Sequence, residues 1–241
     1  MSVSICMATF NGESYIKTQV ESILKQIDSH DEVIISDDFS KDRTCEIIKS
    51  FNDDRIILLE NKVQSGVIKN FEKALQQSKG EYIFLSDQDD VWIKNKVKIF
   101  LQYLKKFDVV QSDAVVVNSK LEELYSGYFD LTQAKTGLLK NVLKNSYIGC
   151  NMAFSRRVLD MALPFPKDIP MHDMWIGITG EFFFKTFFIK EKLLLYRRHT
   201  SNFSQTGFKS PFTFQQKIKF RINVIKYFPL LLKRKLGKRF D

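Results

Sequence analysis

Strand-like and helix-like segments alternate through the first 92 residues, and this alternation constrains the fold more than any other feature. Short apolar runs typical of strands occupy residues 3–9, 32–36, 55–60 and 81–86. Between them, apolar residues recur at helical spacing over residues 15–27, 42–51 and 68–78. This β-α-β-α-β-α-β order predicts an α/β fold whose central sheet is mostly parallel, with helices on both of its faces.

Polar residues follow three of these predicted strands. They are residues 9–11 after the first strand, Asp37 and Asp38 after the second, and Asp87, Asp89 and Asp90 after the fourth. In parallel sheets, ligands bind beyond the carboxyl ends of the strands. Asp is also common in solvated turns, but clustered carboxylates repel one another and favour a neutralising cation. The convergence of three strand ends therefore favours a site for Mg²⁺ or Mn²⁺, which prefer oxygen ligands.

The pattern after residue 92 is less regular. It predicts a helix over residues 94–107, strands over 108–118 and 147–154, a helix within 171–184 and a final strand over 187–199. Residues 119–145 are polar and fit a loop and a helix.

The three cysteines are far apart and include no Cys-x-x-Cys pair, so neither a disulfide framework nor a zinc site is indicated. A reducing cytoplasm is the simplest compartment. The amino terminus lacks the basic and apolar regions of a signal peptide, and we find no run of the ~18 apolar residues that a membrane span needs.

The net charge of +9 belongs to the C-terminal tail. From Lys209 onward there are ten basic residues and one acidic residue, whereas residues 1–208 contain 27 of each. Apolar residues of the tail recur at roughly helical spacing with basic residues between them, and Pro229 is expected to bend or split the helix. Two interpretations stay open. The helix packs on the domain with a solvated basic face, or it lies on an anionic membrane surface.

Seven short motifs occur in the order found in one enzyme family. They are ATFNGESYIKTQVESIL (8–24), SDDFSKDRT (36–44), SGVIKNF (65–71), GEYIFLSDQDDVW (80–92), IGCNMAFSRRV (148–158), HDMW (172–175) and LYRRHTSN (195–202). Together they resemble the inverting family 2 glycosyltransferases of the GT-A fold, and within these the rhamnosyltransferase-like subgroup. The resemblance implies a GT-A domain over residues 1–208, with a nucleotide-binding half at 1–92 and an acceptor and catalytic half at 93–208. The basic tail, 209–241, lies outside it.

The resemblance also implies roles in donor binding for individual residues. Phe10 matches an aromatic ring that packs on the nucleobase, although a core role is the usual one for Phe. Asp38 matches a residue that hydrogen-bonds the base or ribose, whereas Asp37 fits a loop cap equally well. Lys69 matches a basic residue near the nucleotide, or is a solvated helix lysine. Further donor contacts are expected from Thr9, Glu13, Asp87 and Gly149.

The Asp-x-Asp of the family falls on Asp87 and Asp89, which we expect to hold Mg²⁺ or Mn²⁺. Asp89 is the better candidate for direct contact, and Asp90 fits a role in orienting its neighbours. His199 matches a histidine near the metal or the diphosphate, although a lone His is more often structural. Arg197 and Arg198 are candidate diphosphate partners. Only one of the two is expected to face the site, because strand neighbours point to opposite faces.

Asp173 is the candidate general base, since an inverting transfer needs a carboxylate to take the proton of the acceptor hydroxyl. Nearby Met171, Met174 and Trp175 are candidates for an apolar wall that raises its pKa. Its position also fits the N-cap of the following helix, and both roles are compatible. Many family members carry Glu-Asp here, and His172 replaces that Glu, as in the rhamnosyltransferase-like subgroup.

These observations predict a metal-dependent inverting glycosyltransferase that uses a nucleotide-activated sugar, with dTDP-rhamnose as one candidate. Its acceptor would be a saccharide or a lipid-linked saccharide of a cell-surface polysaccharide. The tail would place the enzyme on the inner face of the cell membrane, and its apolar content favours lipid over nucleic acid. Two alternatives are a sugar-phosphate nucleotidyltransferase, which normally shows a Gly- and Arg-rich loop after the first strand, and a membrane or nucleic-acid adaptor, which leaves the acidic cluster unexplained.

Overall fold

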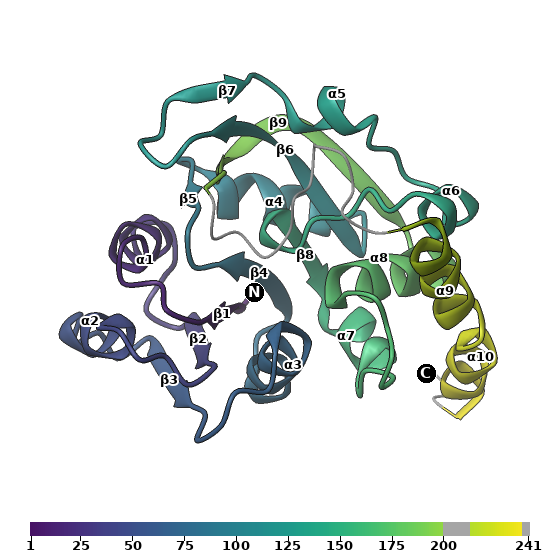
Figure 1. Ribbon diagram of the computed structural model, residues 1–241, viewed down its shortest axis with the longest axis horizontal. Helices are drawn as coiled ribbons and strands as arrows, with labels where there is room; N and C mark the ends of the chain where they lie inside the picture. The colour runs from purple at the N-terminus through teal and green to yellow at the C-terminus, as the bar shows by residue number, and fades with distance from the viewer. Residues whose placement is uncertain (200–212, 238–241) are drawn as a thin grey trace.

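The computed structural model describes residues 1–199 and 213–237 (Figure 1). Within these residues, nine strands form one sheet in the order β3-β2-β1-β4-β8-β6-β9-β5, with β7 paired to β6. The strands are β1 (Val3–Thr9), β2 (Glu32–Asp37), β3 (Ile56–Glu60), β4 (Tyr82–Asp87), β5 (Val91–Trp92), β6 (Val109–Val117), β7 (Glu123–Tyr125), β8 (Met152–Ser155) and β9 (Thr186–Arg197). The predicted α/β fold is confirmed.

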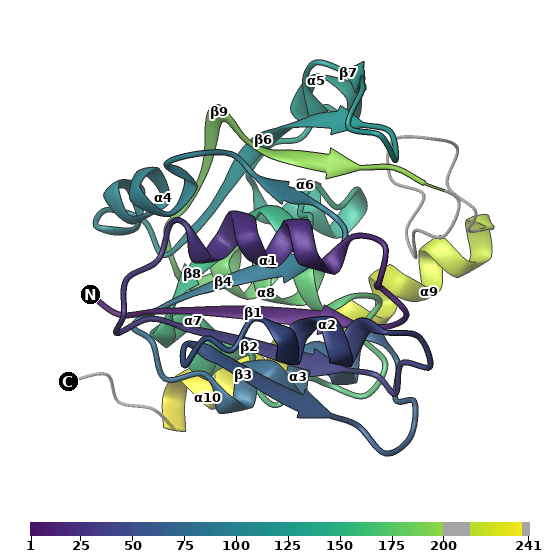
Figure 2. The same ribbon diagram turned by 90° about the vertical axis from the view of Figure 1, so that its left-hand side faces the viewer.

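The strands of the first half are all parallel, as the alternation predicts. Strands β3, β2, β1 and β4 pair in parallel, and their arrows point the same way in Figure 2. The second half is mixed, because β8 pairs antiparallel with both β4 and β6, whereas β9 runs parallel to β6. In the parallel part, Thr9 is in register with Asp37, and Ala8 with Asp87. The register therefore brings the predicted polar strand ends to one edge.

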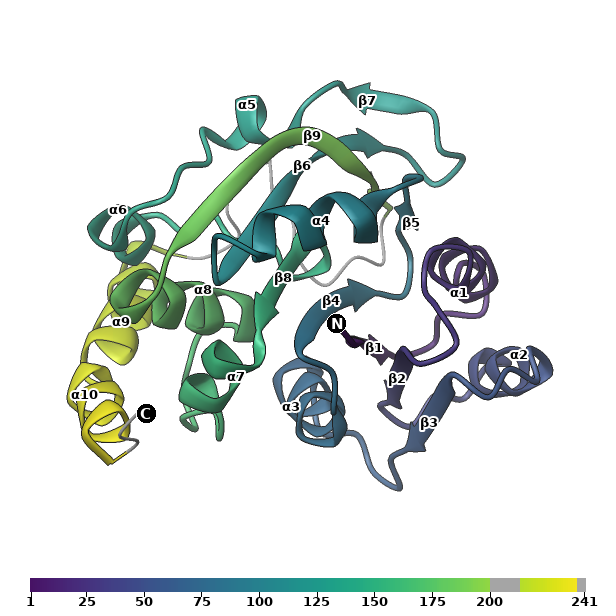
Figure 3. The ribbon, with the colours of Figure 1, turned by 180° about the vertical axis from the view of Figure 1, so that it is seen from behind.

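Helices cover both faces of the sheet. One face carries α1 (Ile16–Leu24), α2 (Thr44–Ser50) and α4 (Lys96–Leu104), and α4 lies across β6 and β8 in Figure 3. The other carries α3 (Val67–Gln77), α7 (Arg156–Ala162) and α8 (His172–Phe183). Strand β1 shows why both faces are covered. Val3, Ile5 and Met7 join the first core, whereas Cys6 joins the second, since successive side chains point to opposite faces.

Residues 147–154 differ from the strand that we predict there. A 3-10 turn, η1 (Gly149–Asn151), comes first, and only from Met152 does the chain join the sheet. The buried side chain of Asn151 explains the difference. Its amide nitrogen donates to the carbonyls of Ser112 and Asp113 in β6, so the side chain supplies bonds that a strand would make with its backbone.

Short elements that the pattern does not resolve fill residues 119–145. They are β7, α5 (Tyr128–Thr132) and α6 (Leu138–Leu143). Helix α7 and strand β5 are likewise additional to the predicted elements. None of the helices within 1–199 and 213–237 combines the length and apolar character needed to cross a membrane.

The described part of the basic tail forms two helices, α9 (Phe214–Ile225) and α10 (Phe228–Gly237), which lie along α6, α7 and α8 (Figure 1). The split falls just before Pro229, as expected, because proline is tolerated in the first turn of a helix. Val224 and Leu231 are buried against the domain, and Arg234 donates to the carbonyls of Met161 and Ala162. The tail therefore packs on the domain. The rest of residues 209–241 lies outside the described part.

Candidate active site

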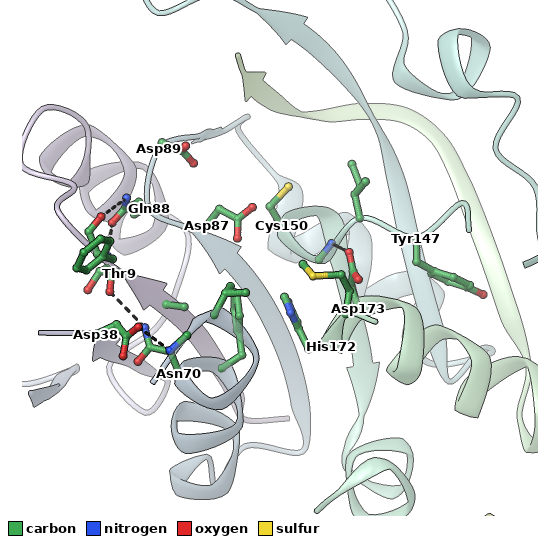
Figure 4. A pocket seen from close by; sticks show the side chains of 18 of the residues that line it. Thr9, Asp38, Asn70, Asp87, Gln88, Asp89, Tyr147, Cys150, His172 and Asp173 are labelled. Atoms are coloured by element: carbon green, nitrogen blue, oxygen red, sulfur yellow. Dashed lines mark hydrogen bonds between the residues drawn. The ribbon is translucent and has the colours of Figure 1, made fainter. Parts of the chain in front are cut away.

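A cavity of about 600 Å³ opens at the carboxyl ends of β1 and β4. Its volume lies within the range of small-molecule sites. The first half of the chain contributes Thr9, Phe10, Asp38, Asn70, Asp87 and Asp89 to its wall. The second half contributes Tyr128, Tyr147, Gly149, Cys150, His172 and Asp173. Figure 4 shows Asp87 between these two groups, with Asp173 and His172 on the far side of it from Thr9 and Asp38.

Acidic side chains crowd the centre of this cavity. Carboxylate oxygens of Asp87 and Asp90 and the sulfur of Cys150 lie within 4.8 Å of one another. Burial, and then repulsion by Asp90 and Asp89, raises the pKa of Asp87 well above its usual range. Burial followed by repulsion from Asp89 raises the pKa of Asp90 to about 7. The site therefore holds its negative charges at a free-energy cost that a cation would relieve.

The residues present fit a divalent metal ion. The Oδ2 atom of Asp90 is buried and accepts no hydrogen bond from the described residues. Asp87 and Asp89 both line the cavity, where carboxylate oxygens suit Mg²⁺ or Mn²⁺. The thiol of Cys150 is a poor ligand for such hard cations, and burial raises its pKa well above the usual value.

His199 lies beside the acidic cluster, next to Asp89. Its Nε2 is 2.9 Å from Oδ2 of Asp89, and its ring stacks on Tyr15. Among the described residues, the compact group of candidate ligands joins Asp87 with Asp90 and Cys150, not with Asp89 and His199. The structure thus places His199 next to one predicted metal ligand and leaves its role a proposal.

Asp173 lies in the first turn of α8 and lines the cavity. The N-cap position belongs to Met171, so Asp173 is not the cap itself. Its Oδ2 accepts a hydrogen bond of 3.0 Å from the backbone N–H of Gly149, and its Oδ1 accepts one of 2.6 Å from Met174. Burial nevertheless raises the pKa of Asp173 to about 6, because it outweighs both hydrogen bonds.

His172 precedes Asp173 and is buried against the ring of Phe71, with 3.9 Å between the ring centroids. Burial lowers its pKa to about 3, so the imidazole is neutral at physiological pH. It therefore adds no positive charge beside Asp173. A Cβ atom on Gly149 would lie 2.9 Å from Nε2 of His172, so glycine is what allows η1 to approach this helix end so closely.

Phe10 lies at the mouth of the cavity with 40% of its surface exposed, and it is not a core residue. The side chain of Gln88 holds its backbone from both sides. Phe10 N–H donates to Oε1 of Gln88 at 2.9 Å, and Nε2 of Gln88 donates to the Phe10 carbonyl at 3.0 Å (Figure 4). A Cβ on Gly12 would lie only 2.3 Å from that Oε1. Gln88 thus fixes the loop after β1 (residues 10–15, the first loop) to the loop after β4 (residues 88–90, the acidic loop).

Both carboxylates at the end of β2, Asp37 and Asp38, support loops. Asp38 accepts hydrogen bonds from the backbone N–H groups of Ser65 and Gly66, just before α3, although it also lines the cavity. Asp37 accepts from the hydroxyl of Thr9 at 2.9 Å and from the N–H of Ser40. Asp37 therefore caps the loop that follows it, and Asp38 likewise binds the backbone of the loop before α3.

Four predicted donor-binding residues are not among those that line the cavity. Glu13 and Lys69 are exposed, and Oε2 of Glu13 accepts from the N–H of Arg43. The guanidinium of Arg197 is buried and donates to the carbonyls of Asp89 and Ser119. That of Arg198 lies 3.2 Å from the hydroxyl oxygen of Tyr196. Arg197 thus holds the acidic loop in place.

Three residues of the site were missed in the sequence. Gln88 is the variable position of the Asp-x-Asp motif, so the motif predicts no role for it. Asn70 donates to the Thr9 carbonyl and lines the cavity. Lys96, which lies within the helix predicted over residues 94–107, is completely buried, and Asp90 and Asp87 are near enough to favour its charged form. The apolar periodicity of α4 could have indicated Lys96, because it occupies the buried face together with Phe100.

The amino-acid sequence matches a known protein family. A sequence model described as "Glycosyl transferase family 2" matches residues 4–161. A curated β-1,3-glucosyltransferase of Escherichia coli, WfgD, which acts from UDP-Glc on GlcNAc-diphosphoundecaprenol, is 29% identical over 193 residues, or 74% of this chain and 70% of the relative. The dTDP-rhamnosyl transferase RfbG of Shigella flexneri is 29% identical over 216 residues, or 81% and 72%.

Solved structures share the fold. TarS of S. aureus, residues 1–349 in complex with UDP-GlcNAc, superposes with a TM-score of 0.69 at 18% identity, covering 95% of this chain and 73% of that one. Glucosyl-3-phosphoglycerate synthase of Mycobacterium tuberculosis, in complex with Mn²⁺, UDP and glucosyl-3-phosphoglycerate, gives a TM-score of 0.59 at 17% identity and covers 97% and 79%. At these identities the likeness shows the fold.

Proposed function

The chain belongs to glycosyl transferase family 2, and from this premise we propose that it moves a sugar from a nucleoside-diphosphate donor to a hydroxyl group, with inversion at the anomeric carbon. The observation that carries the proposal is the arrangement of one cavity. Asp173, with its raised pKa, and the acidic cluster around Asp87 both line it. The two groups meet the two needs of the reaction, a base for the acceptor and an anchor for the diphosphate.

The chemistry follows from this arrangement. Asp173 takes the proton of the acceptor hydroxyl as its oxygen attacks the anomeric carbon, and the bond from that carbon to the diphosphate oxygen breaks. The nucleoside diphosphate leaves with the bonding electrons. Gly149 and Met174 hold the carboxylate of Asp173 in a fixed orientation. Asp87 and Asp89 would hold Mg²⁺ or Mn²⁺, which would supply positive charge to the diphosphate.

The donor end of the cavity lies in the first half of the chain. The exposed ring of Phe10 offers a stacking face for a nucleobase. Thr9, Asp38 and Asn70 line the same end, where polar atoms can select the base or ribose. Gly149 and Cys150, across from Asp87, form the wall of the sugar subsite. His199 and Arg198 remain candidates for diphosphate contacts once a donor is bound.

The relatives suggest the chemical class of both substrates. RfbG is a dTDP-rhamnosyl transferase and WfgD uses UDP-Glc, so we propose a pyrimidine-nucleotide sugar, with dTDP-rhamnose as one candidate. WfgD transfers to a sugar linked through diphosphate to undecaprenol, which favours a lipid-linked acceptor at the inner face of the cell membrane. The product would be part of a cell-surface polysaccharide.

A surface beside the acceptor end suits a membrane. We name as the α6–α9 surface the exposed apolar residues Leu139, Leu143, Phe214, Ile218, Ile222 and Ile225. The two helices are joined where the guanidinium of Arg221 donates to the Leu143 carbonyl. Exposed Lys219 lies on α9, and exposed Lys144 directly follows α6. The chain leaves α6 directly into Asn145 and Tyr147, which line the cavity. A lipid-linked acceptor held in an anionic bilayer would thus meet the cavity from this side.

The proposal is tested by supplying a panel of nucleotide sugars with Mg²⁺ or Mn²⁺ and measuring release of the nucleoside diphosphate. At least one UDP- or dTDP-sugar should be hydrolysed slowly without acceptor and faster with a lipid-linked saccharide. Consumption of a nucleoside triphosphate and a sugar 1-phosphate, with release of diphosphate, would show a nucleotidyltransferase and overturn the proposal. So would the absence of turnover with every donor.

A further inference from the structure

A lysine buried beneath the active site has no role in the chemistry described so far. Lys96 is the first residue of α4, and none of its surface is exposed. Lysine is almost never completely buried without a partner, because removing the ammonium group from water is costly. Burial lowers the pKa of Lys96 to about 7, although nearby Asp90 and Asp87 favour its charged form. A lysine kept here at such a cost requires an explanation.

Both hydrogen-bond acceptors of its ammonium group lie in the turn η1. Nζ of Lys96 is 3.2 Å from the carbonyl oxygen of Cys150 and 2.9 Å from Oδ1 of Asn151. It also lies 4.8 Å from the ring centroid of Trp92. Among the described residues, no carboxylate forms an ion pair with it within 4.0 Å. The lysine therefore binds the turn η1 and not the acidic cluster.

Asn151 carries this contact onward. Its Oδ1 accepts from Lys96 and from the hydroxyl of Ser112, and its Nδ2 donates to two carbonyls of β6. The oxygen and the nitrogen of the Asn151 side chain thus each make two hydrogen bonds, and these bonds fix the C-terminal end of η1. Buried networks of this kind hold a unique geometry only while every member is satisfied.

The other end of the same turn faces the candidate base. The N–H of Gly149, one residue before Cys150, donates to Oδ2 of Asp173. The close approach of η1 to α8 at Gly149 leaves no space for a Cβ, so a shift of the turn would change the distance between this amide and the carboxylate. Fixing η1 at Cys150 and Asn151 fixes that distance.

We propose that Lys96 is a positioning residue for glycosyl transfer. By holding the Cys150 carbonyl and the Asn151 side chain, it sets the Gly149 amide against Asp173 and so orients the carboxylate toward the acceptor hydroxyl. This inference rests on the proposed function of Asp173. It assigns Lys96 no contact with either substrate.

The test is Lys96→Met, which keeps an unbranched side chain only one atom shorter and removes its donors. Lys98→Met is the matched control, because Lys98 is an exposed residue of the same helix. A misplacement of about 1 Å can cost ~10²-fold in rate, so kcat of Lys96→Met should fall at least tenfold while the donor KM changes less than threefold. Because the Gly149 amide stabilises the carboxylate form of Asp173, loosening it should also move the acidic limb of kcat/KM to higher pH. Lys98→Met should match the wild type.

A second readout separates this inference from the proposed function. The titration of the Asp173 carboxyl, followed by NMR with ¹³C-labelled aspartate, needs no substrate. A higher pKa in Lys96→Met supports the positioning role even if no donor is turned over. An unchanged pKa together with an unchanged kcat overturns it. Should Lys96→Met fail to fold, Ser112→Ala removes one donor to the same Asn151 oxygen and should shift both readouts in the same direction, by less. Unchanged values in that variant would also overturn the inference.

Discussion

The backbone N–H of Gly149 donates a 3.0 Å hydrogen bond to Oδ2 of Asp173, and this contact joins two segments that lie 24 residues apart. This hydrogen bond lowers the free-energy cost of burying the carboxylate but does not abolish that cost, since burial still raises the pKa of Asp173 to about 6. The pair therefore holds a carboxylate that is charged at neutral pH and yet basic enough to take a proton.

The first prediction concerns pH. An aspartate whose pKa is about 6 is protonated below that pH and ionised above it. A general base acts in its ionised form, so kcat/KM should fall about tenfold per pH unit below pH 6 and level off above it. Initial rates from pH 4.5 to 8, with the fraction of folded protein checked at each pH, would measure this. A plateau that extends down to pH 4.5 would show that Asp173 is not the base.

The second prediction concerns the first loop. Gln88→Ala removes both hydrogen bonds that hold the Phe10 backbone, so the proposed stacking platform for the nucleobase should loosen. We expect the donor KM to rise several-fold with kcat changed less than twofold. Gln76→Ala, an exposed position on α3, serves as control. An unchanged donor KM in Gln88→Ala would remove Phe10 from the proposed donor site.

The third prediction concerns the metal. Asp89→Ala removes a proposed metal ligand and one of three neighbouring carboxylates whose repulsion raises the pKa of Asp87. Transfer should be abolished, while the melting temperature of the metal-free protein stays equal or rises. Mn²⁺ should raise the melting temperature of the wild type, because it binds the folded state, and that of Asp89→Ala much less. Full wild-type activity in EDTA would contradict the metal proposal.

The fourth prediction concerns the membrane. Each basic residue near an anionic surface contributes about 1 kcal/mol, which salt screens. Full-length protein should sediment with vesicles that contain anionic lipid at low salt, and less at high salt. Leu139→Ser with Ile222→Ser, both on the α6–α9 surface, should weaken this binding. Val63→Ser with Leu124→Ser, which are exposed elsewhere, should not. Equal sedimentation of the two double variants would place the contact on another surface.

The parallel half of the fold could be predicted because short stretches of sequence are enough to determine its strands and helices. Residues 3–92 alternate between two periodicities, and each predicted strand and helix is present within two or three residues. The polar strand ends meet because parallel register carries them to one edge. The segment around Asn151 could not be predicted in this way, since its turn depends on side-chain bonds to a strand 38 or 39 residues away.

Individual roles were harder to predict than the place of the site. Asp87, Asp89, Asp173 and Gly149 do line one cavity. Arg197 was expected near the diphosphate because guanidinium groups suit phosphate, yet its donors bind two backbone carbonyls. Residue type alone does not say which way a side chain points when two arginines follow each other, Arg197 as the last residue of β9 and Arg198 just beyond it. Lys96 and Gln88 could not be picked out by residue type, because each binds a segment far away in the sequence: Lys96 binds the Cys150 carbonyl and the Asn151 side chain, and Gln88 binds the Phe10 backbone.

The central claim is that this chain transfers a sugar with inversion and that Asp173 is the base. The most direct measurement is the anomeric configuration of the product, read by NMR coupling constants, together with kcat of Asp173→Asn and of the exposed control Asp54→Asn. We predict a configuration opposite to that of the donor, a loss of ~10²-fold or more in kcat for Asp173→Asn with donor affinity unchanged, and wild-type rates for Asp54→Asn. Retained configuration, or a loss in Asp173→Asn that appears only as weaker donor binding, would contradict the account.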